Sequence, residues 1–206
     1  MNRLHKISAI LTAAMLGAVM FTGCMDKDVN VAEEDLPYGA TMREAKTTYA
    51  VPVSYDRRFV NEAQLTALTD YLASIQNGDG AGYAASTLDF YADYQLNEVY
   101  SSQYKTMDEM VVALQGSVAE ITADDFEFAM ATIDGFTQER VVSGLNTMIE
   151  ILDKINGESD FMSTVDNCWA LDMQWLIRYN NGGSTMLVDD QYVFMFEIDG
   201  KYYCVM

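Results

Sequence analysis

The sequence predicts an α+β domain in which helices pack on one side of a C-terminal antiparallel β-meander. The middle of the chain carries apolar residues at helical spacing, with one clear stripe at Leu65, Leu68, Leu72 and Ile75. From Trp169 onward the apolar and polar side chains instead alternate, as they do in half-buried strands. A run of helices followed by a run of strands is typical of the α+β class.

The helical part is expected to contain four helices separated by capping and glycine signals. A capping box at Asn61 opens the first helix, and the glycine-rich run 77–82 ends it. A second helix is expected over 83–98. Another capping box at Thr106 opens a short third helix, and Thr137 is placed to cap the fourth.

The strand part begins with alternation over 126–130, which predicts a half-buried strand. The polar run 180–183 and the pair 199–200 are expected to be turns, the second of them a tight hairpin. Between these turns the apolar residues of 192–198 form another strand, and 201–206 form the last one. The longest apolar face comprises Trp169, Leu171, Met173, Trp175, Ile177 and Tyr179.

Residues 49–206 are therefore expected to form a single domain. Half of the 206 residues are hydrophobic, which is enough for one sizeable core. Residues 24–48 mix charges with a proline and a glycine, show no apolar period, and are expected to be a flexible acidic tether. Residues 48–55 are rich in strand formers, but Pro52 cannot donate to a ladder, so a strand formed there is expected to be an edge strand.

Residues 1–23 have the form of an export signal. A short basic head ends at Lys6, an apolar run covers 7–20, and small residues precede Cys24. The apolar run is shorter than the roughly 20 residues that a membrane-spanning helix needs. We therefore expect these residues to be removed from the mature protein.

The run Phe21-Thr22-Gly23-Cys24 resembles the lipobox of bacterial lipoproteins, with phenylalanine where the family more often has leucine. The resemblance implies cleavage before Cys24 and a diacylglyceryl thioether on its thiol. Two acyl chains give stable anchoring where one gives only marginal binding. The expected location is the cell membrane, with the protein lipid-anchored on its extracytoplasmic side. The alternative is an ordinary signal peptide with an incidental cysteine.

The composition of the mature chain argues against several classes of enzyme. The single histidine, His5, lies in the signal, so the mature chain has no imidazole. This excludes the usual Ser/His/Asp and Cys/His mechanisms and removes the commonest side-chain ligand of zinc and copper. We therefore expect no catalytic residue of these kinds, no metal site and no cofactor.

The charge of the mature chain indicates which partners it can have. Loss of Arg3 and Lys6 leaves ten basic residues against 31 acidic ones, a formal charge of −21. Such a surface repels nucleic acid and favours basic partners or cations. The alternative is that the charge only maintains solubility. The pairs Asp124-Asp125 and Asp189-Asp190 lack the alternating oxygen ligands and central glycine of an EF-hand loop.

Two further cysteines, Cys168 and Cys204, lie in predicted strands. An exported chain could join them in a disulfide. A simple meander would place another strand between them, so we expect two separate buried thiols that behave as small apolar residues.

The order of the elements resembles the nuclear transport factor 2-like (cystatin-like) α+β fold. A first helix ending near Asn77-Gly78-Asp79, and a last hairpin that includes Asp199-Gly200-Lys201, carry the resemblance over residues 60–206. The fold curls its sheet into a cone around a pocket that helices close. Its members include enzymes, binding modules and interaction domains, so the fold does not decide the function.

A small ligand or a protein partner could occupy such a pocket, which would make the protein a non-catalytic binding module. The aromatic candidates for its lining are Tyr91, Tyr94, Trp169, Trp175, Tyr179 and Tyr192. The alternative is that these side chains simply fill the core, which the strict alternation around the tryptophans favours.

Two other functions are kept as alternatives. One is an enzyme of the lyase or isomerase type with a carboxylate base, for which Asp172 and Asp89 are the candidates and Tyr91 or Tyr94 the hydrogen-bond donors. The other is a structural envelope protein whose acidic face is bridged by calcium or docks on a basic envelope protein.

Overall fold

The computed structural model of the chain describes residues 32–118, 126–137, 143–157, 160–179, 182–187 and 192–206. The chain divides into two compact units, 1–36 and 37–206. The described part of the first unit holds a single turn of 3-10 helix, Glu33–Asp35. All of the other helices and strands of the described residues belong to the second unit.

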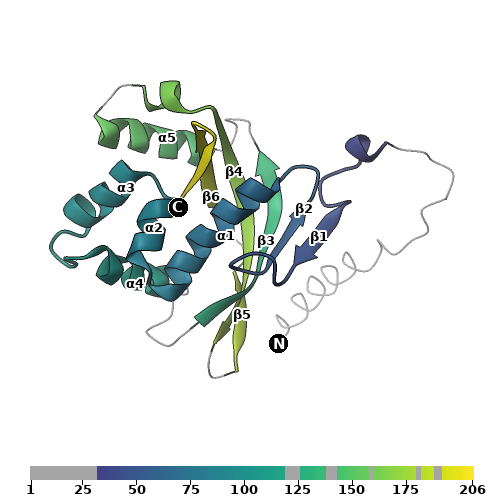
Figure 1. Cartoon of the computed structure of the whole chain (residues 1–206), viewed down its shortest axis with the longest axis horizontal. Coiled ribbons are helices and arrows are strands. Elements are labelled where there is room, and N and C mark those ends of the chain that lie inside the picture. The colour runs from purple at the N-terminus through teal and green to yellow at the C-terminus, as the bar shows by residue number, and fades with distance from the viewer. Residues whose placement is uncertain (1–31, 119–125, 138–142, 158–159, 180–181, 188–191) are drawn as a thin grey trace, which may run out of the picture. The chain divides into compact units, whose positions relative to one another are not determined.

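The described residues of the second unit form a mixed seven-stranded sheet (Figure 1). Its strands lie in the order β1-β2-β3-β4-β6-β7, with β5 also paired to β4. The β2–β3 pair is parallel and the other pairs are antiparallel. The α+β class and the C-terminal meander are thereby confirmed. The strands are β1 (Met42–Ala45), β2 (Val53–Asp56), β3 (Phe126–Thr137), β4 (Asn167–Tyr179), β5 (Ser184–Leu187), β6 (Tyr192–Ile198) and β7 (Lys201–Val205).

Five α-helices accompany the sheet in the described residues: α1 (Glu62–Asn77), α2 (Gly80–Ser86), α3 (Asp89–Tyr94), α4 (Met107–Val118) and α5 (Ser143–Asn156). Helix α1 begins with the predicted capping box of Asn61 and Gln64, and it ends at Gly78 in the left-handed conformation that glycine adopts most easily. None of the helices in the described part combines the length and apolar character needed to span a membrane.

The single helix predicted over 83–98 is wrong. Asp79 caps α2 by accepting a hydrogen bond from the Gly82 N–H, so the helix starts before Tyr83. It ends at Thr87, whose extended backbone separates α2 from α3. A turn of π-helix, Gln95–Val99, follows α3 directly.

The other capping predictions have mixed outcomes. Thr106 accepts the Glu109 N–H at the start of α4 as predicted, but the Glu109 carboxylate accepts the N–H of Lys105 instead of completing the box. Thr137 does not cap a helix, because it ends β3 and pairs with Ala170 of β4.

The strand predicted over 126–130 is present and continues to residue 137, and its pairing with β4 shifts register at two places.

The N-terminal boundary of the domain also differs from the prediction. The unit begins at Pro37, and β1 lies inside the segment expected to be a tether. Because β1 and β3 flank β2 on its two sides, β2 is not the edge strand that Pro52 suggested. Pro52 precedes β2, and its carbonyl accepts a hydrogen bond from the N–H of Ala131. Its missing N–H therefore interrupts no ladder.

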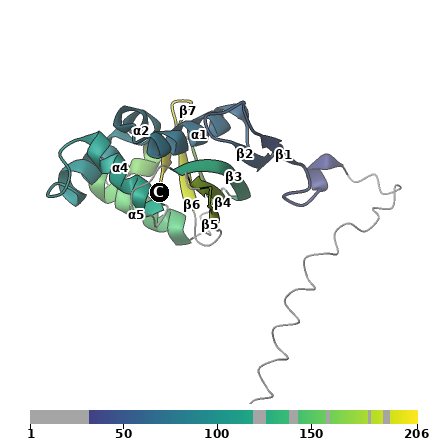
Figure 2. The same ribbon diagram turned by 90° about the horizontal axis from the view of Figure 1, so that it is seen from below.

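Helices cover the sheet on both faces rather than on one. The predicted apolar face of β4, from Trp169 to Ile177, packs against the leucine stripe of α1 and against Met110 and Val111 of α4. The opposite face of the same strand buries Cys168 and Ala170 in a second cluster. Phe194 and Phe196 of β6 join this cluster, as do Leu145 and Leu152 of α5. Figures 1 and 2 show α1 and α5 on different sides of the strands.

The alternation on β4 yields a prediction for Trp175, which is 2% exposed in the centre of the first cluster. Trp175→Ala should lower the free energy of unfolding by about 3–5 kcal/mol, because it empties a large core site. Trp175→Phe should cost less, since the indole N–H meets no acceptor among the described residues and its removal breaks no hydrogen bond. Urea unfolding measures both changes.

Tyr94→Ala provides the control, because Tyr94 is 36% exposed and its loss should change the unfolding free energy by no more than about 0.5 kcal/mol. An unchanged melting temperature for Trp175→Ala would show that this face of β4 is exposed in solution.

Candidate functional site

The candidate site is a groove that begins on the outward side of α1. The leucine stripe of this helix faces the core, so residues at the same spacing on the other side face away from it. These are Ala63, Thr66, Ala67 and Asp70. Two alanines and a threonine leave a shallow surface here, because their side chains are short.

Two other elements complete the groove, which is open to solvent and has a volume of about 530 Å³. Ala85 and Ser86 at the end of α2 line one side, and Lys201, Tyr202 and Tyr203 of β7 line another. Figure 2 shows β7 beside α1 and α2. The groove therefore lies where the last strand of the sheet meets two helices.

A second groove of about 350 Å³ adjoins the first, because both are lined by Thr66 and Asp70. Its other lining residues are Thr48, Tyr49, Ala50, Glu62 and Thr69. Burial raises the pKa of the Tyr49 hydroxyl, and the neighbouring Tyr55 and Glu62 raise it further. Tyr49 therefore stays neutral at ordinary pH and offers a hydrogen-bonding hydroxyl to a bound molecule.

The charges in the two grooves are mainly acidic. Asp70 and Glu62 lie on α1, and Lys201 lies on β7. Asp70 is exposed and takes part in no ion pair with another described residue. Within the described ranges, no three histidine, cysteine, aspartate or glutamate side chains gather closely enough to hold a metal ion. Among the described lining residues, the groove thus presents carboxylates, one lysine and short side chains.

The backbone of β7 adds hydrogen-bonding groups to the groove. β7 is an edge of the sheet and pairs with β6 alone among the described strands. Asp199 and Gly200 both have positive φ, which makes a two-residue turn of the primed type and pairs Ile198 with Lys201. In this register the N–H and C=O of Lys201 and Tyr203 point to β6, and those of Tyr202 point to the free edge.

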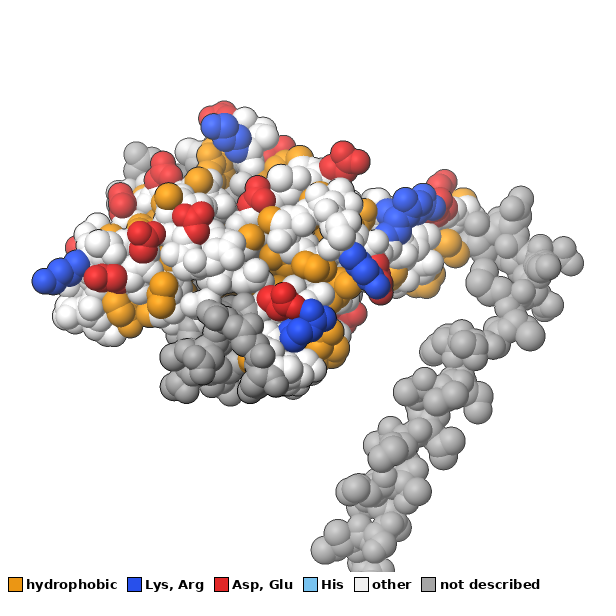
Figure 3. Space-filling view, turned by 60° about the horizontal axis from the view of Figure 1, so that its bottom comes forward, with side chains coloured by type: hydrophobic (Ala, Val, Ile, Leu, Met, Phe, Trp, Pro, Cys, Tyr) orange, Lys and Arg blue, Asp and Glu red, His pale blue; other side chains and the backbone are white. Residues whose placement is uncertain are grey.

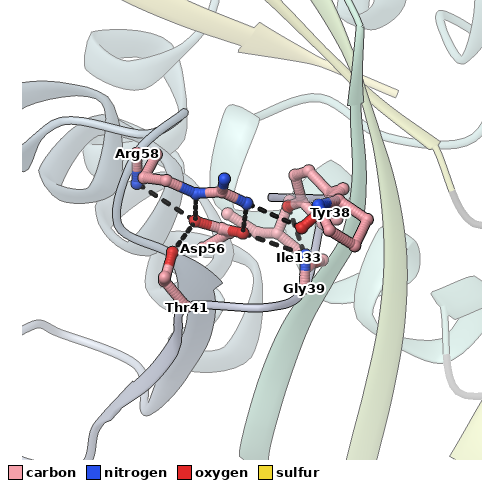
Figure 4. A network of polar contacts seen from close by, with 7 residues as sticks. Tyr38, Gly39, Thr41, Asp56, Arg58 and Ile133 are labelled. Atoms are coloured by element: carbon pink, nitrogen blue, oxygen red, sulfur yellow. Dashed lines mark hydrogen bonds and ion pairs between the residues drawn. The ribbon is translucent and has the colours of Figure 1, made fainter. Parts of the chain in front are cut away.

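A second polar feature, centred on Asp56, lies at the opposite edge of the sheet (Figure 4). Asp56 is completely buried at the end of β2. Its Oδ1 accepts hydrogen bonds from Thr41 Oγ1 at 2.5 Å and from Arg58 N and Nε at 3.1 Å. Its Oδ2 accepts from Gly39 N at 2.9 Å and from Arg58 Nη2 at 2.8 Å.

This network fastens the start of the domain to the sheet. Arg58 Nη2 also donates to the Pro37 carbonyl at 2.7 Å, and the Tyr38 hydroxyl donates to the Ile133 carbonyl of β3 at 3.1 Å. The Arg58 guanidinium beside Asp56 is the largest influence that holds the pKa of this carboxyl well below its usual range. Because both carboxylate oxygens are occupied and the group stays ionised, Asp56 has a structural role and is not a candidate base.

The predicted ligand-binding residues do not line one pocket. Trp169, Trp175 and Tyr179 belong to the first core cluster, where Trp175 contacts Phe128 edge-on and Trp169 stacks on Phe136. Trp169 is 7% exposed and, like Trp175, packs against other described side chains. These aromatic residues fill the interior between the sheet and α1.

Tyr91 and Tyr94 lie elsewhere. Tyr91 packs in the second cluster, with Tyr192 at its margin, and its hydroxyl donates to the Met206 carbonyl at 2.8 Å. Burial raises the pKa of the Tyr91 hydroxyl to about 12, so it remains a donor. Tyr94 is exposed at the end of α3. The structure therefore does not bring these tyrosines together with the tryptophans.

The two carboxylates considered as bases are also separate features. Asp89 is exposed at the start of α3, whereas Asp172 is half-buried in β4 opposite Gly135 and Tyr192. Cys24 and the pairs Asp124-Asp125 and Asp189-Asp190 lie outside the described residues.

Cys168 and Cys204 form no disulfide with each other. As the predicted meander requires, β6 separates their strands, and the two side chains face opposite sides of the sheet.

The groove was missed in the sequence because its residues carry no distinctive signal. An outward helix face made of alanine, threonine and aspartate is the ordinary complement of an apolar stripe. The Asp56 network was missed because its partners in residues 37–41 were assigned to the tether.

Figure 3 shows acidic side chains scattered over the face in view, without one dominant patch.

The Asp56 network yields a prediction about pH. Asp56 has a folded-state pKa below its unfolded value of about 3.9, so its contribution to stability is present above about pH 4 and is lost as the pH falls below that. Asp56→Asn should cost about 3–5 kcal/mol at pH 7, the range for breaking a buried pair. This difference from the wild type should shrink in urea unfolding near pH 3.

Glu127→Gln is the matched control, since Glu127 pairs with Arg178 and both side chains are more than half exposed. This substitution should cost less than about 1 kcal/mol. A cost at pH 7 as small as that of the control would show that the network does not hold the domain together.

No family model, no curated protein and no solved structure matches this chain. The groove, its charges and the edge of β7 are therefore the basis on which a function can be inferred.

Proposed function

We propose that this chain is a bacterial lipoprotein, anchored through Cys24 on the extracytoplasmic side of the cell membrane, and that its domain binds a protein partner without catalysing a reaction. The anchor is supported by the export signal of residues 1–23 and by the lipobox that ends at Cys24. The binding role is supported by the groove between α1, α2 and β7.

The form of the groove is the observation that carries the binding role. Small-ligand sites usually bury most of their ligand in a concave, largely apolar pocket. Here Trp169 and Trp175, which could line an interior pocket, are buried among other core side chains, and the two grooves lie open along α1. Such a surface suits a segment of another protein better than a small molecule.

The absence of histidine after residue 5 supports a binding role over catalysis. Imidazole is the commonest acid–base group in enzymes. Asp70 is the carboxylate that both grooves share, and no partner that would tune it as an acid or base lies within ion-pair distance in the described residues. We therefore assign the Asp70 carboxylate a role in recognising a partner rather than in catalysis.

The finer fold assignment is also a proposal. Helices that precede a C-terminal meander, and a tight hairpin at Asp199 and Gly200, support a nuclear transport factor 2-like arrangement for residues 60–206. β1 and β2 then form an addition at the β3 edge of the sheet. In this arrangement the interior that related folds use as a pocket is occupied by side chains of the domain itself.

The positions of the two polar features are compatible with an anchored binding module. The chain enters the domain at Pro37 beside the β1 edge, where the Asp56 network holds it, and the groove lies at β7, the opposite edge of the sheet. Attachment to a membrane through the N-terminal side would thus leave the β7 edge accessible to a partner.

The anchor is tested by Cys24→Ala. This substitution removes the thiol that would carry lipid, so the protein should leave the membrane fraction and lose a metabolic fatty-acid label. The melting temperature of the domain should not change, because the core and the Asp56 network lie within residues 37–206.

Cys168→Ala controls for labelling of other thiols, since this cysteine is buried in β4 and the label should remain. A Cys24→Ala protein that still carries the fatty-acid label and still sediments with membranes would contradict the lipoprotein assignment.

A further inference from the structure

We infer that the groove between α1, α2 and β7 accepts an extended segment of a partner protein, which adds a strand to β7 and places a lysine or arginine beside Asp70. This mode of binding rests on the proposed function and specifies the chemistry of the partner. If this mode of binding is wrong, the lipid anchor and a protein-binding role at another surface of the domain could still be correct.

The backbone of β7 is open towards the groove at Tyr202, whereas Cys204, which points the same way, is completely buried beneath the helices. Tyr202 directs its N–H and C=O towards the free edge and also lines the groove. An edge strand with free backbone groups is a template for another extended segment, and recognition by strand addition uses these groups for affinity. The hydrogen bonds need no particular sequence in the partner, except that proline cannot donate.

The side chains around that edge are small. Ala63, Thr66 and Ala67 of α1 and Ala85 of α2 flank the groove, and their side chains are short. Since a paired strand lies about 4.7–4.9 Å from its neighbour, bulky residues at these places would exclude it. Short residues here keep the groove open beside Tyr202.

The charges along the groove favour a basic side chain in the partner. Asp70 lines both grooves and Glu62 lines the second one, so each groove carries at least one carboxylate. Lys201 lies at the other side, next to the hairpin. A partner with a basic side chain towards α1 complements this arrangement, and the formal charge of −19 on the whole chain also favours a basic partner.

A second copy of this chain is a less suitable occupant. Pairing two β7 edges would bring together two molecules of the same large negative charge. Each copy would also offer the other its own acidic α1 face in place of a basic side chain. Self-association is therefore an outcome that would overturn the inference.

The experiment selects short peptides from a displayed random library on the mature chain, residues 24–206, with Cys24→Ser to keep it in solution without lipid. The selected peptides are then synthesised in matched pairs that differ only by lysine or glutamate at the enriched basic position. Fluorescence anisotropy measures their affinity for the parent protein and for three further variants.

The parent protein should select peptides enriched in lysine or arginine and poor in proline, and it should bind the lysine member about threefold to tenfold more tightly than the glutamate member. Asp70→Lys should reverse this preference. Thr66→Trp should reduce binding more than tenfold, because an aromatic ring on the exposed side of α1 fills both grooves.

Glu150→Lys makes a comparable charge reversal on α5, outside the grooves, and should leave the preference for lysine intact. Melting temperatures near that of the parent would show that the variants are folded. The inference is overturned if no peptide is enriched, if the peptides bind Thr66→Trp as tightly as the parent, if Asp70→Lys keeps the lysine preference, or if sedimentation shows a dimer of the parent that Thr66→Trp dissociates.

Discussion

Burial of β4 on both of its faces is the constraint on which the rest of the domain depends. Trp169, Leu171 and Trp175 need a cover on one face, and Cys168 and Ala170 need one on the other. Helix α1 supplies the first cover and α5 the second, and β3, β5 and β6 satisfy the backbone of the strand along its two edges. Since removal of any cover would expose a large apolar area, we expect the domain to unfold as one cooperative unit.

This filled interior determines where a function can be located. A pocketed fold can bind a ligand between sheet and helices, but here Trp175, Phe128 and the leucines of α1 occupy that space. In the described part of the chain, the proposed recognition site therefore lies on the outside of α1 and at the edge of β7. At the other edge, Asp56 and Arg58 fix the point at which the chain from the proposed anchor enters the domain. The proposed anchoring and the proposed recognition would therefore involve opposite edges of the sheet.

The sequence predicted the features that local chemistry decides. The capping box of Asn61, the alternation on β4 and the Asp199-Gly200 hairpin each follow from a few neighbouring residues, and the structure contains all three. It did not predict features that depend on distant contacts. Thr137 has the residue type of a helix cap, but pairing with β4 keeps it in a strand. The role of residues 37–41 depends on one buried carboxylate that nothing in the local pattern distinguishes, and the groove depends on how α1, α2 and β7 meet.

A filled interior and an unpaired backbone at Tyr202 can be tested together by hydrogen–deuterium exchange of the unliganded mature chain, resolved by residue. Amides of β4 around Trp175 should exchange only through global unfolding, because this strand is paired along both edges. The Tyr203 amide, bonded to β6, should be protected, and the adjacent Tyr202 amide should exchange orders of magnitude faster. Equal protection of Tyr202 and Tyr203, or rapid exchange around Trp175, would contradict the account.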